Sequence, residues 1–116
     1  MPLRAIEAIE MNARLTWPSN IKTGDVVKLR LLIQHPMETG YLQDFTGHYI
    51  PRNVIQWIKA TYDQKEVFNV QISSGIAANP FFEFYIKATV TGLIVVKWLD
   101  DAGEEGEIRQ LLPVKP

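Results

Sequence analysis

The length, composition and charge of the chain exclude several classes of protein. Its 116 residues suffice for one domain spanning 1–116 with a single core, and 47% hydrophobic with 22% charged residues indicates a globular chain. A net charge of −1 disfavours nucleic acid as a partner. No apolar run approaches the roughly 18 residues of a membrane span. The absence of cysteine excludes disulfides, thiolate nucleophiles and Cys-ligated metals.

The first predicted element is a short N-terminal leader over residues 1–10. Ile6 and Ile9 are spaced three apart, which favours a helix from Leu3 to Glu10. Eight residues are too few for a helix that is stable alone. We therefore expect a short appendage or a frayed leader rather than part of the core.

Alternating apolar and polar residues predict about seven β-strands along the rest of the chain, with turn signals at nearly regular spacing. The run from Leu93 to Leu99 is almost continuously apolar, which indicates a central strand buried on both faces. The pattern predicts an all-β fold, an immunoglobulin-like antiparallel β-sandwich. The expected strands are Met11–Trp17, Val27–Ile33, Val54–Tyr62, Val67–Ile72, Phe82–Lys87, Leu93–Leu99 and Ile108–Val114.

A loop interrupts this pattern after the second strand and runs to about Tyr49. Pro36 cannot donate a ladder hydrogen bond, so strand pairing should stop there. His35, Met37 and Glu38 place an imidazole, a thioether and a carboxylate within four residues. Loops of roughly a dozen residues are long for a compact domain and more often carry function than ordinary connections do. The loop is therefore a candidate functional region.

The aromatic side chains divide into expected core and expected surface groups. Trp57, Trp98 and Phe84 lie inside alternating strands and should be core, whereas Pro18 could leave the ring of Trp17 at an edge. Adjacent residues of a strand face opposite ways, so if Phe82 is core then Phe81 and Tyr85 share the other face. That face is either an interface anchor or is covered by the chain's own second layer.

Motifs of enzymes and metal sites are missing. The chain has neither phosphate-binding glycine loops nor a nucleophile with a paired base, so we expect no enzyme and no cofactor. With only His35 and His48, a three-histidine metal site is impossible; a mononuclear site of both histidines with Met37 or Glu38 is an alternative that we favour less. The acidic run around Asp100 and Asp101, with Glu104 and Glu105, is expected to be a solvated hairpin tip rather than a calcium site.

Four ordered blocks resemble the SoxZ family, the smaller subunits of the SoxYZ carrier of bacterial thiosulfate oxidation. The resemblance spans about residues 13–105, while the leader Met1–Glu10 and the tail Glu105–Pro116 match less well. Six consecutive residues and three further blocks in the right order make it specific. The blocks are His35-Pro36-Met37-Glu38-Thr39-Gly40, Gly47-x-x-Ile50-Pro51-Arg52, Ile76-Ala77-Ala78-Asn79-Pro80-Phe81-Phe82-Glu83-Phe84-Tyr85 and Trp98-x-Asp100-Asp101-x-Gly103.

The resemblance implies an immunoglobulin-like sandwich without a catalytic cysteine, paired with a SoxY-like protein. A cysteine on the glycine-rich C-terminal arm of that partner carries sulfur intermediates to the pathway's enzymes, which would be transient partners. An isolated chain with an uncovered aromatic face could form a homo-oligomer instead. The expected partner-binding residues are His35, Met37, Glu38, Arg52, Asn79, Phe81 and Tyr85.

The leader does not have the form of a secretory signal, because Glu7 and Glu10 break any apolar region. The residues alone suggest the cytosol. The resemblance implies the periplasm, which the chain would reach by export bound to a partner that carries the signal.

Arg52 is a candidate contact for the partner's arm, because a guanidinium can pair with sulfonate or sulfate oxygens. An ordinary surface arginine is the simpler interpretation. A free-standing binding sandwich, or a periplasmic metal- or ligand-binding sandwich that uses the His35–Met37 loop, remains the alternative.

Overall fold

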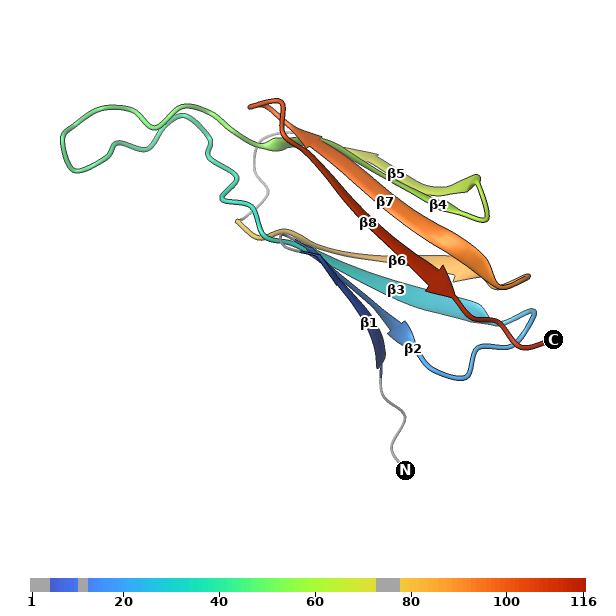
Figure 1. Cartoon of the computed structure of the whole chain (residues 1–116). Coiled ribbons are helices and arrows are strands. Elements are labelled where there is room, and N and C mark those ends of the chain that lie inside the picture. Colours follow the sequence, from blue (N-terminus) through green and yellow to red (C-terminus); the bar gives the residue numbers. More distant parts are fainter. Residues whose placement is uncertain (1–4, 11–12, 73–77) are drawn as a thin grey trace.

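Two four-stranded antiparallel sheets face each other and form a β-sandwich (Figure 1). The structure is a computed structural model that describes residues 5–10, 13–72 and 78–116, and side chains within the last two ranges. The predicted all-β, immunoglobulin-like sandwich is confirmed, and no helix occurs in these ranges. The strands are β1 (Ala5–Glu10), β2 (Ala13–Pro18), β3 (Val26–Ile33), β4 (Ile55–Tyr62), β5 (Lys65–Gln71), β6 (Phe81–Lys87), β7 (Gly92–Asp100) and β8 (Glu105–Leu112).

One sheet has the strand order β1-β2-β3-β6 and the other the order β5-β4-β7-β8. Residues alternate between an inner face, which forms the shared core, and an outer face. On β3 the inward residues Leu29, Leu31 and Ile33 are fully buried. The prediction that β7 is buried on both faces is wrong. Leu93 and Lys97 are exposed, because the outer face of this antiparallel sheet is not covered by another layer.

The N-terminal leader is an eighth strand, so the expected helix is wrong for residues 5–10. β1 pairs along its whole length with β2, from Ala5 opposite Pro18 to Glu10 opposite Ala13, and it also lies against β8. Pairing with β2 satisfies the backbone hydrogen bonds of a segment too short to be a stable helix. Residues 1–4 of the leader lie outside the described residues, as do Met11 and residues 73–77, which include Ile76 and Ala77 of the third block.

The tryptophans only partly follow the prediction. Trp98 is buried, as expected, and Phe84 is buried and stacks on Phe68 of the opposite sheet with ring centroids 4.5 Å apart. Trp17, for which the sequence left both a core position and an edge position open, is 1% exposed and belongs to the core. Trp57, expected in the core, is only half-buried, because it lies on the outer face of β4 next to a bulge between Ile55 and Trp57.

Candidate functional site

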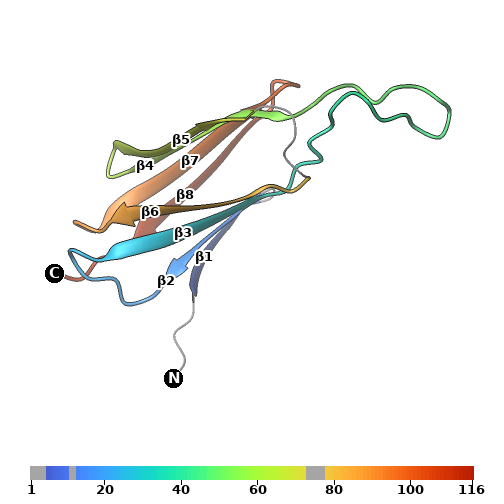
Figure 2. The same cartoon turned by 180° about the vertical axis from the view of Figure 1, so that it is seen from behind.

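The loop from residue 34 to residue 54 leaves one end of the sandwich between β3 and β4 and projects well beyond both sheets (Figures 1 and 2). Its two stems come together at a bridge in which the main chains of Glu38 and Asn53 exchange two hydrogen bonds of 2.8 Å.

Among the described residues, no helix is long and apolar enough to cross a membrane.

His35 lies at the base of the first stem and is buried, with 8% exposure. Its Nδ1 accepts a hydrogen bond from the amide of Met37 at 3.0 Å, so in the neutral ring the proton is on Nε2. Nε2 then donates to the carboxylate of Asp100 at 3.0 Å. Both ring nitrogens are therefore engaged within the fold, and His35 stabilises the base of the loop.

Met37, two residues further along the same stem, packs into the core and contacts the start of β4. Its side chain is 4% exposed, and its sulfur accepts a weak hydrogen bond from the amide of Ile55 at 3.4 Å. Its φ of 52° is in the left-handed region, which is rare for a residue of this type. Such a conformation persists only where the surroundings enforce it, which is frequent at functional sites.

Asn79 joins the start of β6 to the end of β3. Its side-chain oxygen accepts a hydrogen bond from the amide of His35 at 2.9 Å, and its own amide donates to the carbonyl of His35 at 2.7 Å. Its φ of 53° suits asparagine, which tolerates the left-handed region. Asn79 is thus a structural connector at the base of the loop.

The second stem is held by Asp101, in the turn between β7 and β8. Its carboxylate accepts hydrogen bonds from the side-chain amide of Gln56 at 3.1 Å and from the amide of Val54 at 3.2 Å, and Arg52 lies 3.5 Å away. These contacts, led by the one from Gln56, hold the pKa of Asp101 below its ordinary value. Arg52 keeps 54% of its side chain exposed.

The sequence suggested that the acidic run from Asp100 to Glu105 is a solvated hairpin tip. This expectation is wrong for Asp100 and Asp101. Asp100 is 3% exposed and accepts from His35 and, at 2.9 Å, from the amide of Glu104. The consecutive aspartates hold one stem each, because neighbouring residues point to opposite sides of the chain. Residues from all four blocks that resemble SoxZ thus meet at one end of the sandwich, namely His35, Arg52, Asn79, Asp100 and Asp101.

The outer face of β3 and β6, here called the β3–β6 face, presents the predicted aromatic pair. Phe81 is 53% exposed and Tyr85 61% exposed, so the chain's own second layer does not cover them. Phe81 lies opposite Leu32, and Tyr85 lies opposite Lys28. The ammonium of Lys28 is 5.8 Å from the centre of the Tyr85 ring. Between these pairs, the carboxylate of Glu83 contacts Lys28 at 3.0 Å and Arg30 at 3.4 Å. The face has apolar groups around a central ion-pair cluster.

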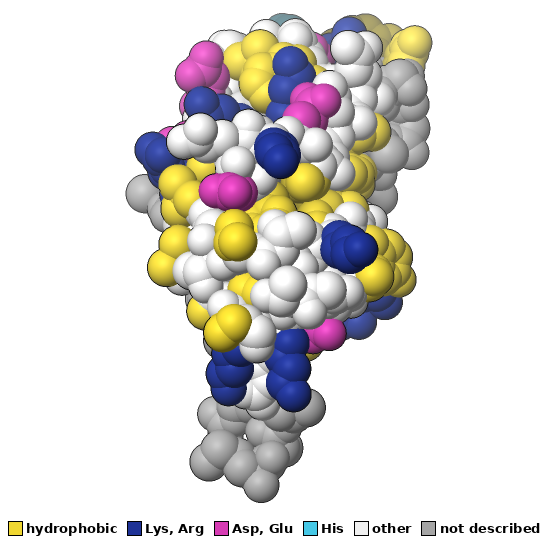
Figure 3. All heavy atoms as spheres, turned by 90° about the vertical axis from the view of Figure 1, so that its right-hand side faces the viewer, with side chains coloured by type: hydrophobic (Ala, Val, Ile, Leu, Met, Phe, Trp, Pro, Cys, Tyr) yellow, Lys and Arg dark blue, Asp and Glu magenta, His cyan; other side chains and the backbone are white. Residues whose placement is uncertain are grey.

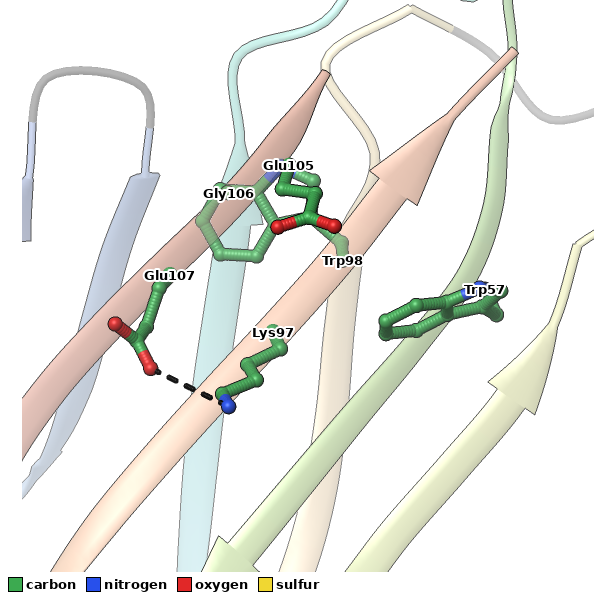
Figure 4. A pocket seen from close by; sticks show the side chains of 6 residues that line it. All are labelled: Trp57, Lys97, Trp98, Glu105, Gly106 and Glu107. Atoms are coloured by element: carbon green, nitrogen blue, oxygen red, sulfur yellow. Dashed lines mark ion pairs between the residues drawn. The ribbon is translucent and has the colours of Figure 1, made fainter. Parts of the chain in front are cut away.

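A pocket of about 450 Å³ lies along β7 and β8 (Figure 4). The ring of Trp98 lies directly over Gly106, where a Cβ would come 1.9 Å from the ring. Lys97 contacts Glu107 at 3.7 Å. A pocket of about 280 Å³ borders the loop base beside His35 and Asp100. Neither pocket pairs a nucleophile with a base.

The predicted site residues fall into two groups. His35, Met37, Glu38, Arg52 and Asn79 meet at the base of the loop, where His35 and Met37 are buried and Glu38 is half-buried. Phe81 and Tyr85 lie on the β3–β6 face. Whether these residues bind a partner stays a prediction.

The alternative metal site is not assembled. His48 hydrogen-bonds to Thr46 further along the loop, and nowhere in residues 13–72 and 78–116 do three His, Cys, Asp or Glu residues gather as a metal site would require.

The sequence reasoning missed the structural role of Asp100 and Asp101 and the exposed aromatic residues in the middle of the loop. The aspartate doublet directly after a tryptophan-bearing strand was the available signal for the first. The spacing of Tyr41, Phe45 and Tyr49 within a loop was the signal for the second.

Solved structures similar in fold include a superoxide reductase (neelaredoxin) from Ignicoccus hospitalis, with a TM-score of 0.68 and 18% identity, covering 94% of this chain and 83% of that one. The sulfur carrier protein SoxY from Chlorobium limicola f thiosulfatophilum has a TM-score of 0.56 and 12% identity, covering 92% of this chain and 76% of that one. At these identities the likeness shows the fold alone. No curated protein matches the chain in sequence.

The model of the sulphur oxidation protein SoxZ family matches residues 15–110, most of the chain, and the match includes both groups of predicted site residues. The chain therefore belongs to the SoxZ family.

Proposed function

We propose that this protein is the non-catalytic subunit of a SoxYZ-type carrier complex. It pairs with a SoxY-like protein whose C-terminal cysteine arm carries covalently bound sulfur during thiosulfate oxidation, and it helps to dock the enzymes that act on that sulfur. Membership of the SoxZ family supports this role. The absence of cysteine is consistent with it, because the sulfur-bearing thiolate must then belong to another chain.

The observation that carries the proposal is the uncovered β3–β6 face. Leu32, Phe81 and Tyr85 form an apolar surface on neighbouring strands, and aromatic residues are the usual anchors of protein interfaces. The ion pairs of Glu83 are part of the same surface and can re-pair with polar groups of the partner. We assign this face to the SoxY-like subunit.

The loop base has a different role in the proposal. Because His35, Met37 and Asn79 are engaged inside the fold, they position the loop, while Arg52 and Glu38 are available to contact the partner's arm. Arg52 is held beside Asp101, and a sulfonate or sulfate group carried by the arm could compete for its guanidinium.

The cellular setting is part of the proposal. We place the complex in the periplasm and expect the chain to be exported together with its SoxY-like partner. Isolated chain that forms a homo-oligomer would, on this view, use the β3–β6 face as a substitute contact.

Co-purification from the native host tests the proposal. The tagged chain is isolated at low detergent and moderate salt, and the bound proteins are identified by mass spectrometry. The proposal predicts a near-stoichiometric partner with a glycine-rich tail that contains a cysteine. Recovery of the chain alone, under conditions that preserve nanomolar complexes, would contradict it.

A metal- or ligand-binding sandwich is the second candidate. It is less well supported, because both ring nitrogens of His35 and the sulfur of Met37 already have partners in the fold. Stoichiometric copper or zinc retained by the purified protein would favour it.

A further inference from the structure

We propose that the tip of the long loop, residues 41–49, is a second docking element that inserts into an apolar cleft of an enzyme of sulfur oxidation. This segment is called the aromatic finger. The inference rests on the proposed carrier function and extends it, because it assigns the transient enzymes a surface separate from the β3–β6 face.

The aromatic finger carries four apolar side chains that do not pack on the sandwich. Phe45 is 101% exposed, Tyr41 84%, Tyr49 65% and Leu42 60%. These are four of the eleven large exposed hydrophobic residues in the described part of the chain, gathered within nine positions. Scattered exposed apolar residues are ordinary, whereas such a concentration on one projecting segment marks an interaction site.

The finger is built as a fixed structure. The carboxylate of Asp44 accepts hydrogen bonds from the amides of Thr46 and His48 at 2.9 and 3.0 Å and from the hydroxyl of Thr46 at 2.6 Å. Gln43 and Tyr49 form a bridge, and the amide of Ile50 donates to the carbonyl of Leu42 at 2.8 Å. A segment that is ordered before binding loses less conformational entropy in the complex.

Its position makes the finger reach beyond the sandwich. The molecule is 58 Å along its longest axis, whereas the nine residues of β7 span about 30 Å. At the opposite end of the molecule, Figure 1 shows no comparable loop projecting from the described residues, and apolar side chains there are interspersed with Lys, Arg, Asp and Glu (Figure 3). The convex finger therefore suits a concave partner.

Charge favours a protein cleft over a membrane surface. Between residues 39 and 51 the sequence contains no Lys or Arg, and Asp44 is its only acidic residue. Segments that insert into anionic membranes pair apolar residues with basic ones. The finger instead fits an apolar cleft whose rim carries positive charge facing Asp44.

The size of the finger favours a transient partner. Its four apolar side chains can contribute roughly 500 Å² of contact, since an aromatic residue buries about 150–250 Å². A stable interface buries about 800 Å² on each partner. The finger alone is too small for a permanent subunit contact but adequate for an enzyme that binds and leaves, which separates its role from that of the β3–β6 face.

The test uses the complex of this chain with the SoxY-like subunit of the same host, immobilised through that subunit. Each sulfur-oxidising enzyme of the host is purified and titrated in turn by biolayer interferometry. The variant is Phe45→Ala, and the matched control is Leu111→Ala, which removes a 53% exposed apolar side chain on β8. Because Phe45 is fully exposed, its truncation should leave the fold intact, as checked by circular dichroism.

The proposal predicts that Phe45→Ala weakens binding of at least one enzyme tenfold or more. The affinity for the SoxY-like subunit and the behaviour of Leu111→Ala should stay within twofold of the unaltered chain. The inference is overturned if Phe45→Ala leaves the affinity for every enzyme within twofold, or if it weakens binding to the SoxY-like subunit instead. It is also overturned if the unaltered chain floats with phosphatidylglycerol vesicles and the variant does not. Failure of the unaltered chain to bind the SoxY-like subunit would instead refute the proposed function itself.

Discussion

The imidazole of His35 and the carboxylate of Asp100 meet across 3.0 Å in the interior, although the two residues lie 65 positions apart. The contact joins the first stem of the long loop to the last residue of β7. Asp101, the next residue, holds the second stem through Val54 and Gln56. One two-residue segment therefore sets the direction in which the loop, and the aromatic finger at its tip, leave the sandwich.

The first prediction concerns the stability of this base. His35→Ala removes one partner of the buried carboxylate of Asp100 and leaves the amide of Met37 without its acceptor. We expect the free energy of unfolding to fall by about 2–3 kcal/mol, as for buried polar groups that lose their partners. Urea denaturation measures this. The matched control is His48→Ala in the exposed loop, which should change stability by less than about 0.5 kcal/mol; equal effects of the two variants would refute the assignment.

The second prediction concerns the packing of Trp98 on Gly106. A Cβ at position 106 would lie 1.9 Å from the ring, so Gly106→Ala must displace the indole. We expect a loss of about 1–3 kcal/mol, typical of overpacking. The double variant with Trp98→Leu should show little further loss from the added methyl group, giving a clear coupling in a double-mutant cycle. Additive effects would mean that the ring does not rest on Gly106 in solution.

The third prediction is a pH dependence that comes from Asp101. Its pKa is lowered in the folded protein, mainly by the hydrogen bond from Gln56, from an ordinary value of 3.8. Its stabilising contribution should therefore be complete above about pH 5 and be lost as the pH falls through the lowered pKa. The difference in unfolding free energy between the unaltered chain and Asp101→Asn should shrink as the pH is lowered from 6 to 2. A difference that does not change with pH would contradict this role.

The fold could largely be predicted from the sequence, because the alternation of apolar and polar residues identifies strands and their buried faces. Residues such as Leu29 and Leu31 are placed in the core by this alternation, regardless of which strands pair with theirs. The leader could not. Its pairing with β2 is a tertiary contact, and the spacing of Ile6 and Ile9 gave a helical signal that this contact overrides. Trp57 was misplaced for a related reason, since the bulge beside it changes which way the ring points.

The candidate site could be located but not assembled from the sequence. Pro36 and the length of the loop marked the region, and the alternation of β6 placed Phe81 and Tyr85 on one face; only the structure shows that this face is exposed. That His35 faces inward depends on Asp100, and no local pattern reveals a contact across 65 residues. The aromatic finger was missed because its exposure depends on the direction of the loop, which these long-range contacts set.

The most direct test of the central claim compares two leucines in binding to the SoxY-like subunit by isothermal titration calorimetry. Leu32 lies on the β3–β6 face and Leu93 on the outer face of the other sheet, and both are 37% exposed. Leu32→Ala, alone and with Phe81→Ala, should weaken binding severalfold and more than tenfold respectively, while Leu93→Ala leaves the affinity unchanged. Equal affinities for all three variants, or a loss confined to Leu93→Ala, would contradict the assignment of the β3–β6 face to the partner subunit.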